Sequence, residues 1–254
     1  MNSTATFVNK DSIVRKMWGN SDIVLFIFAG AAAEFALNKA VDWLYFTGKL
    51  PEDPLGRLFS TVGYAHRIIF AAEDEALKAI DTITAIHASV ENQRGAAIPD
   101  WAYRDVLYML MHYSINAYEL LERKLTPTEK EETYNVFYRM GTRMGLKELP
   151  ASYDSWLADR ITHLKNDLAY GKYTPDLFKQ YKKHLGWLRY NIMLQVQGML
   201  LPAYCKRLLK MKSNDFFPVV IGVYRTLKKL NLQTLIRAAI LPPAYKQQIV
   251  ALDR

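Results

Sequence analysis

The sequence lacks the residues and motifs on which several common enzyme classes depend. Cys205 is the only cysteine among 254 residues, which excludes an intrachain disulfide and any zinc site built from cysteines. No glycine-rich phosphate loop, nucleophile elbow or HExxH helix occurs. The Glu-x-x-His pairs of helical di-iron sites are also missing. The corresponding nucleotide hydrolases, serine hydrolases, zinc proteases and di-iron enzymes are therefore excluded.

Long hydrophobic runs are missing too. The most apolar stretch, Ile23 to Leu37, contains Glu34 and falls short of the ~20 apolar residues that a membrane-spanning helix needs. The N-terminus has no basic start followed by an apolar run, so no secretory signal is predicted. We expect a buried core helix over this stretch and, with one cysteine, a cytoplasmic protein.

Acidic residues are outnumbered, which gives a net charge of +8 and a pI near 9.3. The basic residues are dispersed along the chain and form no dense Lys/Arg block, so nucleic-acid binding is not expected. Contact with an anionic membrane surface, or with an acidic cofactor, stays open.

Helical periodicity is present almost throughout, and no convincing period-two strand occurs. Half of the residues are hydrophobic, and no internal repeat or long linker divides the chain. We predict an all-α fold, with an N-terminal extension over residues 1–21 and a single globular multi-helix domain over residues 22–254.

Capping residues predict where the helices begin and end. A first long helix is expected from Asp22 to near Gly48, and a second from Asp53, whose next residue Pro54 suits the first helical position. The acidic run Glu73–Glu75 opens a third. Further starts are predicted at Pro99–Asp100, at Thr126–Glu129, at Ser152 or Ser155, and at Thr174–Pro175. A kink is expected at Pro202, followed by two or three short helices over residues 216–251.

Two histidines lie on apolar helix faces. His87 shares its face with Ala76, Ile80, Ile83 and Val90. His112 also has apolar neighbours. A buried imidazole needs a hydrogen-bond partner or a metal, and the pattern alone favours a hydrogen-bonded core histidine in both cases. The other three, His66, His163 and His184, have polar neighbours and are expected to be solvated.

Arg57 and Thr61 are four residues apart and therefore share one face of the second predicted helix. The guanidinium could extend to solvent or pair with a carboxylate. Alternatively, the two side chains could lie over a reacting oxygen or an anionic cofactor group. Their spacing does not distinguish these interpretations.

The order of several motifs resembles one known family. The string Asp53-Pro-Leu-Gly-Arg57-Leu-Phe-Ser-Thr61 is similar to the DP-x-x-R-x-x-x-T element of the family that joins the MpaB oxygenases to the rubber oxygenases (latex-clearing proteins). The segment from Ile83 to Val90 resembles its histidine motif. The resemblance continues through Tyr103–Leu107, Met111–His112, Tyr118, Leu125–Glu129, Tyr134, Gly145–Leu146, Leu149–Pro150 and Leu241–Pro243.

This resemblance implies a helical fold that encloses a haem b pocket, with His87 as the proximal iron ligand. It further implies that Arg57 stabilises bound dioxygen and that Thr61 forms a hydrogen bond in the same pocket. His112 would be a distal residue, a second ligand or a structural histidine. The implied function is a haem-dependent oxygenase that acts on a small apolar or isoprenoid-like substrate.

The sequence also departs from the family pattern. Ser60 stands where the rubber oxygenases have a lysine before the threonine, and only Asp42 or Glu34 could replace their upstream glutamate. These departures do not favour rubber as the substrate. Two other functions stay open: a non-catalytic haem protein that binds a diatomic gas, and a cofactor-free helical module that binds lipid or a membrane surface.

Overall fold

A computed structural model describes residues 5–48, 52–211, 221–222, 224–226 and 253. Every element in these residues is helical apart from two isolated β-bridges, so the predicted all-α fold is confirmed. The helices of the first half are α1 (Ile13–Trp18), α2 (Ser21–Phe35), α3 (Asp42–Phe46), α5 (Pro54–Phe70) and α6 (Glu73–Arg94). Those of the second half are α7 (Asp100–Leu121), α8 (Pro127–Arg143), α9 (Tyr153–Asp167), α10 (Tyr173–Leu200) and α11 (Ala203–Leu208).

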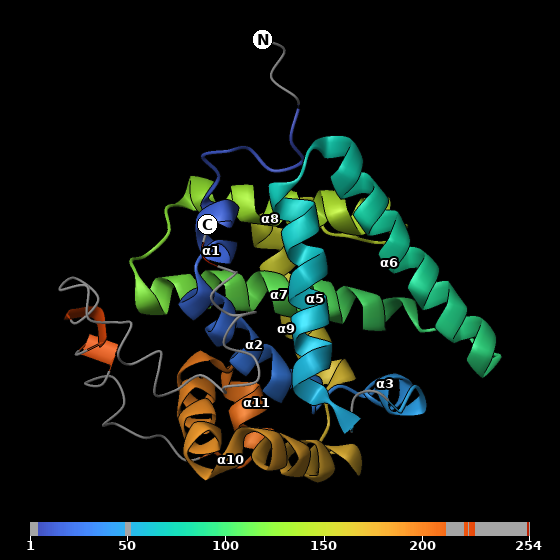
Figure 1. Ribbon diagram of the computed structural model, residues 1–254, viewed down its shortest axis with the longest axis vertical. Helices are drawn as coiled ribbons and strands as arrows, with labels where there is room; N and C mark the ends of the chain where they lie inside the picture. Colours follow the sequence, from blue (N-terminus) through green and yellow to red (C-terminus); the bar gives the residue numbers. More distant parts are fainter. Residues whose placement is uncertain (1–4, 49–51, 212–220, 223, 227–252, 254) are drawn as a thin grey trace.

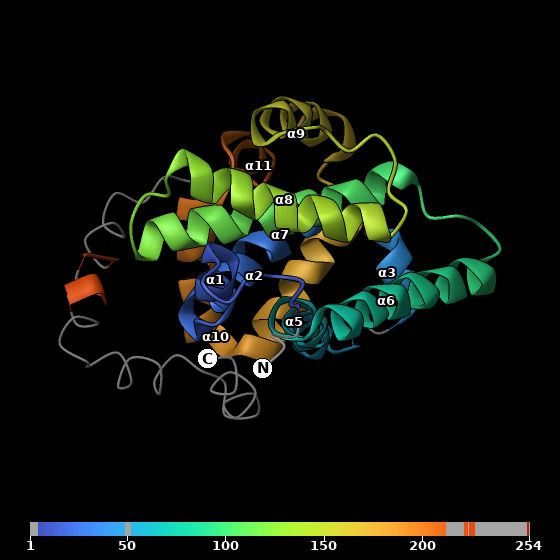
Figure 2. The same cartoon turned by 90° about the horizontal axis from the view of Figure 1, so that it is seen from above.

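Helices α2 and α7 form the centre of the molecule, and the other helices pack around them (Figure 1). They approach closely because Gly30 on α2 has no side chain. A Cβ added at Gly30 would lie 2.4 Å from Cδ1 of Tyr113, which is fully buried on α7. Seen from above, α8 and α9 lie on one side of this pair, and α5 and α6 lie on the other (Figure 2).

The segment predicted as an N-terminal extension, residues 1–21, contains helix α1. Ile13, Val14, Met17 and Trp18 of this helix are buried in the main core. The indole Nε1 of Trp18 donates a 3.1 Å hydrogen bond to Ser114 on α7. The extension therefore packs on the domain for at least this part of its length.

The predicted helix starts are confirmed where a side chain caps the first turn. Asp53 accepts a hydrogen bond from the amide of Gly56, and Pro54 is the first residue of α5. Thr126 and Glu129 form a capping box at α8, and Ser152 caps α9. These interactions span three residues, which is why the sequence could predict them.

The prediction of one helix from Asp22 to Gly48 is wrong, because α2 ends at Phe35 and α3 begins at Asp42. The side chain of Asn38 accepts a hydrogen bond from the amide of Ala40 at 2.8 Å and donates one to Asp105 at 2.7 Å. Its backbone forms a β-bridge with Leu168. These bonds replace helical ones and turn the chain.

The last helices also bend where small or cyclic residues occur. Gly186 interrupts α10 with a φ of 75°, and Pro202 separates α10 from α11. The helices predicted over residues 216–251 lie almost entirely outside the described residues. None of the described helices is both long and apolar enough to cross a bilayer.

Candidate functional site

Helices α5 and α6 form a hairpin whose second arm reaches beyond the other helices (Figures 1 and 2). Beyond Ile80, no residue of α6 is fully buried. One stripe of this half of the helix is nevertheless partly covered, namely Ile83, His87, Val90, Glu91 and Arg94. The predicted histidine therefore lies on a half-covered stripe of α6, between the apolar residues Ile83 and Val90.

His87 has an unusual polar environment. Its Nδ1 is buried and has no hydrogen-bond partner. Its ring lies 5.0 Å from that of Tyr103 on α7, between centroids. Burial lowers the pKa of His87, and the nearby charge of Arg57 lowers it further, while Glu91 opposes both. The imidazole is therefore neutral at neutral pH, which is the protonation state that a metal ligand needs.

Arg57 lies on α5 and is half-buried. Its Nη1 donates a 3.1 Å hydrogen bond to Oγ1 of Thr61, and that hydroxyl donates to the carbonyl of Arg57 at 3.2 Å. Burial lowers the pKa of Arg57. Within the described part of the chain, no carboxylate lies within 4 Å of its guanidinium. Among the described residues, Arg57 is thus a half-buried cation without a carboxylate partner, which costs free energy unless an anionic or polar ligand is bound.

Arg57 and Thr61 contact each other on α5, and α5 packs along α6, which carries His87. The charge of Arg57 lowers the pKa of His87, and no direct contact joins the two side chains among the described residues. The grouping of His87 with the arginine–threonine pair, like their ligand roles, stays a prediction.

His112 has different surroundings. Its Nε2 lies 2.9 Å from Nδ2 of Asn116, and its ring meets that of Tyr113 edge-on. Burial lowers the pKa of His112 well below its ordinary value, and Arg160 on α9 adds to this effect. None of these partners is Arg57, Thr61 or His87. The contacts of His112 are those of a neutral core histidine.

The expectation that His66, His163 and His184 are solvated is wrong for the first two, which are buried. The Nε2 of His66 lies 2.7 Å from the carbonyl oxygen of Trp18, and Nδ1 of His163 contacts two aspartates. The Nε2 of His184 is buried without a partner, although the residue as a whole is only partly covered. Long-range contacts bury these rings, and neighbouring residues in the sequence do not reveal such contacts.

Both acids offered as substitutes for the family's glutamate are engaged in ion pairs. Glu34 is buried, accepts hydrogen bonds from Arg160 and Tyr113 at 2.7 Å each, and so lies in the core. Asp42 on α3 pairs with Arg94 of α6 at 2.6 Å. Neither carboxylate is therefore free to act as a general base beside Arg57.

Two residues that sequence reasoning missed hold the far end of α6. Arg94 lies over the ring of Trp43 at 3.9 Å while it pairs with Asp42. Glu91 accepts hydrogen bonds from the hydroxyl of Tyr103 at 3.0 Å and from the amide of Ile98 at 2.7 Å. Glu91 follows His87 by one helical turn, and this spacing is the only signal in the sequence that could have indicated its role.

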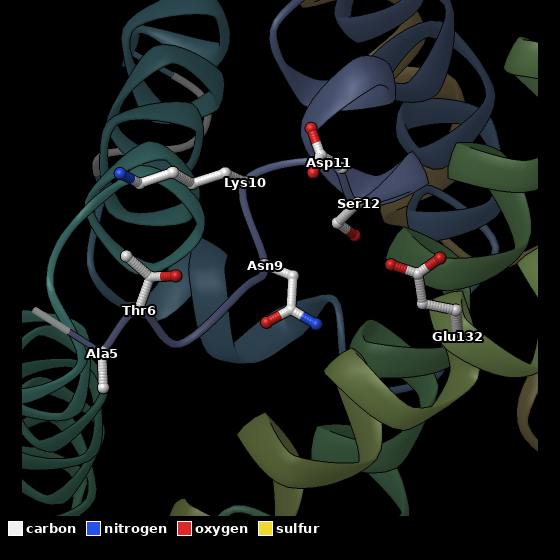
Figure 3. Close-up of a pocket in the computed structure, with 7 residues that line it drawn as sticks. All are labelled: Ala5, Thr6, Asn9, Lys10, Asp11, Ser12 and Glu132. Atoms are coloured by element: carbon white, nitrogen blue, oxygen red, sulfur yellow. The ribbon is translucent and has the colours of Figure 1, made fainter. Parts of the chain in front are cut away.

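A polar pocket elsewhere does not contribute to this site. It lies between loop 5–12 and α8, and Figure 3 shows Asn9, Ser12 and Glu132 around it. It contains no histidine and none of the predicted site residues.

Comparison with known proteins confirms the resemblance. The family model described as "ER-bound oxygenase mpaB/B'/Rubber oxygenase, catalytic domain" matches residues 15–245. The matched range includes α5, α6 and α7 and therefore the whole of the site described above. No curated protein and no solved structure matches the chain significantly. The chain belongs to the family of ER-bound oxygenase mpaB/B' and rubber oxygenase catalytic domains, and this membership implies an oxidoreductase enzyme.

Proposed function

We propose that the face between α5 and α6 binds haem b and that the protein is a haem-dependent oxygenase for a small apolar or isoprenoid-like substrate. One observation supports this most strongly. The Nδ1 of His87 is buried and unpartnered, and the charge of Arg57, which has no carboxylate partner among the described residues, acts on the His87 ring. A protein keeps such groups unpaired at a cost, and a bound ligand offsets this cost.

The residues present fit a haem. His87 supplies a neutral imidazole that can ligate iron, and Arg57 supplies a cation for a propionate or for a polarised oxygen. The haem, when bound, supplies the activation of dioxygen. The half-covered Ile83 and Val90 give the same stripe an apolar surface suited to an apolar substrate.

Thr61 orients Arg57. Because the Thr61 hydroxyl donates its hydrogen to the carbonyl of Arg57, it can accept but not give a further hydrogen bond in this arrangement. It therefore accepts from Nη1 and fixes the guanidinium. Arg57 keeps its other N–H groups for the ligand, so we assign it the polar contact with the reacting oxygen and Thr61 a positioning role.

Haem binding is tested by the optical spectrum of the purified full chain, before and after haem is added. We expect a Soret band that is lost or shifted in His87→Ala and kept in His184→Ala. The control is matched, because His184 is the other histidine with a buried ring nitrogen that lacks a partner. A protein that stays colourless with added haem, or a band unchanged in His87→Ala, would overturn the proposal.

Dioxygen consumption separates an oxygenase from a gas-binding haem protein. With an isoprenoid substrate, we expect consumption by the haem-loaded wild type and a loss of about 100-fold or more in Arg57→Ala, with haem retained. Haem binding without any dioxygen consumption across a series of apolar substrates would favour the gas-binding function.

A second candidate function is contact with an anionic membrane surface. Trp187 and Leu188 follow the kink at Gly186 and are 71% and 57% exposed, and Lys182 and Lys183 are exposed just before it. An exposed tryptophan beside lysines suits the interface of an anionic bilayer. We expect the protein to co-sediment with phosphatidylserine vesicles, and we expect this binding to be weakened in Trp187→Ala. Tyr170→Ala is the control, because it also removes an exposed aromatic ring, and it should bind as the wild type does. Equal binding of both variants would contradict this function.

A further inference from the structure

We propose that Asp105, His163 and Asp167 bind a divalent transition-metal ion at a site separate from the α5–α6 face. The three residues come from two helices. Asp105 lies on α7, whereas His163 and Asp167 are one turn apart near the end of α9. One ligand atom from each residue lies within 4.8 Å of the other two. This cluster took no part in the function proposed above.

The Nδ1 atom of His163 has two carboxylate oxygens within hydrogen-bond distance, but it can carry only one hydrogen. Its Nδ1 lies 2.7 Å from Oδ1 of Asp105 and 2.9 Å from Oδ2 of Asp167. A ring nitrogen carries at most one hydrogen, so it can donate a well-directed hydrogen bond to only one of the two oxygens. A metal ion between the three atoms would accept a lone pair from each of them.

The distances and atom types suit such an ion. Octahedral bonds of about 2.0–2.1 Å place neighbouring ligands about 2.8–3.0 Å apart, close to the separations observed here. One imidazole nitrogen with two carboxylate oxygens is a donor set for Mn²⁺, Fe²⁺ or Zn²⁺ rather than for Ca²⁺, which takes oxygen ligands.

The cluster has more carboxylates than cations, which favours the binding of a positive ion. Asp105 is 4% exposed and His163 is 9% exposed. A third carboxylate, that of Asp159, lies 3.6 Å from Nε2 of His163. Among the described residues, no lysine or arginine forms an ion pair with any of the three aspartates. One imidazolium cannot balance three carboxylates, of which Asp105 and Asp167 are largely shielded from solvent, with side chains 6% and 15% exposed, while that of Asp159 is 34% exposed.

More distant cations reduce this imbalance without removing it. Lys39 and Arg104 act on Asp167 through their charges. The Nζ of Lys39 donates its hydrogen bond to the carbonyl of Asn166, and Arg104 pairs with Glu148 at 2.9 Å.

Neighbouring side chains hold the ligands in place. Asn38 donates to Oδ2 of Asp105 at 2.7 Å, which leaves Oδ1 facing His163. Tyr108 donates to Asp159 at 2.7 Å. Such partners are typical around metal ligands, because they fix the orientation of each carboxylate. A bound ion would join α7, α9 and the turn at Asn38.

Calorimetric titration of the chelator-treated full chain with Mn²⁺, and separately with Zn²⁺, tests the proposal. We expect one ion per chain, and affinities lowered at least 10-fold in His163→Gln and in Asp167→Asn. Asp81→Asn, which alters an exposed aspartate paired with Arg143, is the matched control and should bind as the wild type does. Asp167 is the less buried of the two aspartates, so its variant tests the site even if His163→Gln fails to fold.

The same titration on His87→Ala separates this site from the haem site. We expect binding of the metal to be unchanged in that variant. No binding by the wild type, or equal binding by Asp167→Asn and the wild type, would overturn the metal site and leave the haem proposal untouched. Loss of binding in His87→Ala alone would instead place the ion at the α5–α6 face.

Discussion

At the scale of single residues, the surroundings of Arg57 support the proposed site. Arg160 meets the carboxylate of Glu34 and Arg94 that of Asp42, while Arg15 and Arg139 donate to backbone carbonyls. Arg57 instead has only Thr61 as a side-chain hydrogen-bond partner among the described residues. A residue kept at a cost in stability indicates a function that requires it.

Arg57→Met should therefore leave the unfolding free energy of the haem-free protein unchanged or raise it by up to about 1 kcal/mol, because it removes an uncompensated half-buried charge. Activity should be lost at the same time. Urea denaturation measures the first effect. Arg94→Met is the control and should lower stability by about 1 kcal/mol, since it removes an ion pair and the contact with Trp43. Similar destabilisation by both variants would contradict this account of Arg57.

His112 should make stability depend on pH. Burial keeps it neutral in the folded state, whereas the unfolded chain protonates it below an ordinary pKa of about 6.5. The unfolded state then binds more protons, so its contribution is present above that pH and is lost as the pH falls, at up to about 1.4 kcal/mol per unit. We expect His112→Gln to flatten the decline in unfolding free energy from pH 6.5 to 5. An equally steep decline in the variant would show that other groups cause it.

His163 has the opposite effect. Burial lowers its pKa, but the hydrogen bond and charge of Asp105, with the charges of Asp159 and Asp167, raise it overall. In the metal-free protein, its contribution to stability is therefore present below the ordinary pKa and lost as the pH rises through the raised value. The two histidines thus have opposite effects, and comparing His112→Gln with the wild type isolates the effect of His112.

At the scale of helices, the close approach of α2 and α7 depends on Gly30. Gly30→Ala should lower the unfolding free energy by about 1–3 kcal/mol, because the new Cβ would overlap the Tyr113 ring. Gly198→Ala in α10 is the matched control, since no atom lies within 4 Å of its added Cβ. It should be neutral or should raise stability by up to about 1 kcal/mol. Thermal or urea unfolding measures both, and equal effects would contradict the packing described here.

The helices also show how far the sequence could predict the fold. Starts fixed by a cap within three residues, such as those at Asp53 and Thr126, were predictable. The break after Phe35 was not, because Asn38 turns the chain through contacts with Asp105 and Leu168, which are distant in the sequence. Periodicity reports which face of a helix is apolar, and it contains no information about such partners.

At the scale of the whole molecule, the predicted site draws Arg57 and Thr61 from α5 and His87 from α6, two helices that pack against each other, whereas His112 on α7 has other partners. Helical spacing alone predicted that Arg57 and Thr61 share one face of α5, and they form a hydrogen bond there. The grouping with His87 was implied only by the family resemblance, since it depends on how α6 packs beside α5. The attachment of α6 through Glu91 and Arg94, and the cluster around His163, required the structure.

Chemical rescue can show whether His87 ligates a haem iron, as we claim. In haem-loaded His87→Gly, free imidazole can enter the space left by the side chain and replace the lost ligand. We predict an optical spectrum that differs from the wild type without imidazole and returns to the wild-type spectrum as imidazole is added. A variant spectrum identical to that of the wild type before imidazole is added would contradict the claim.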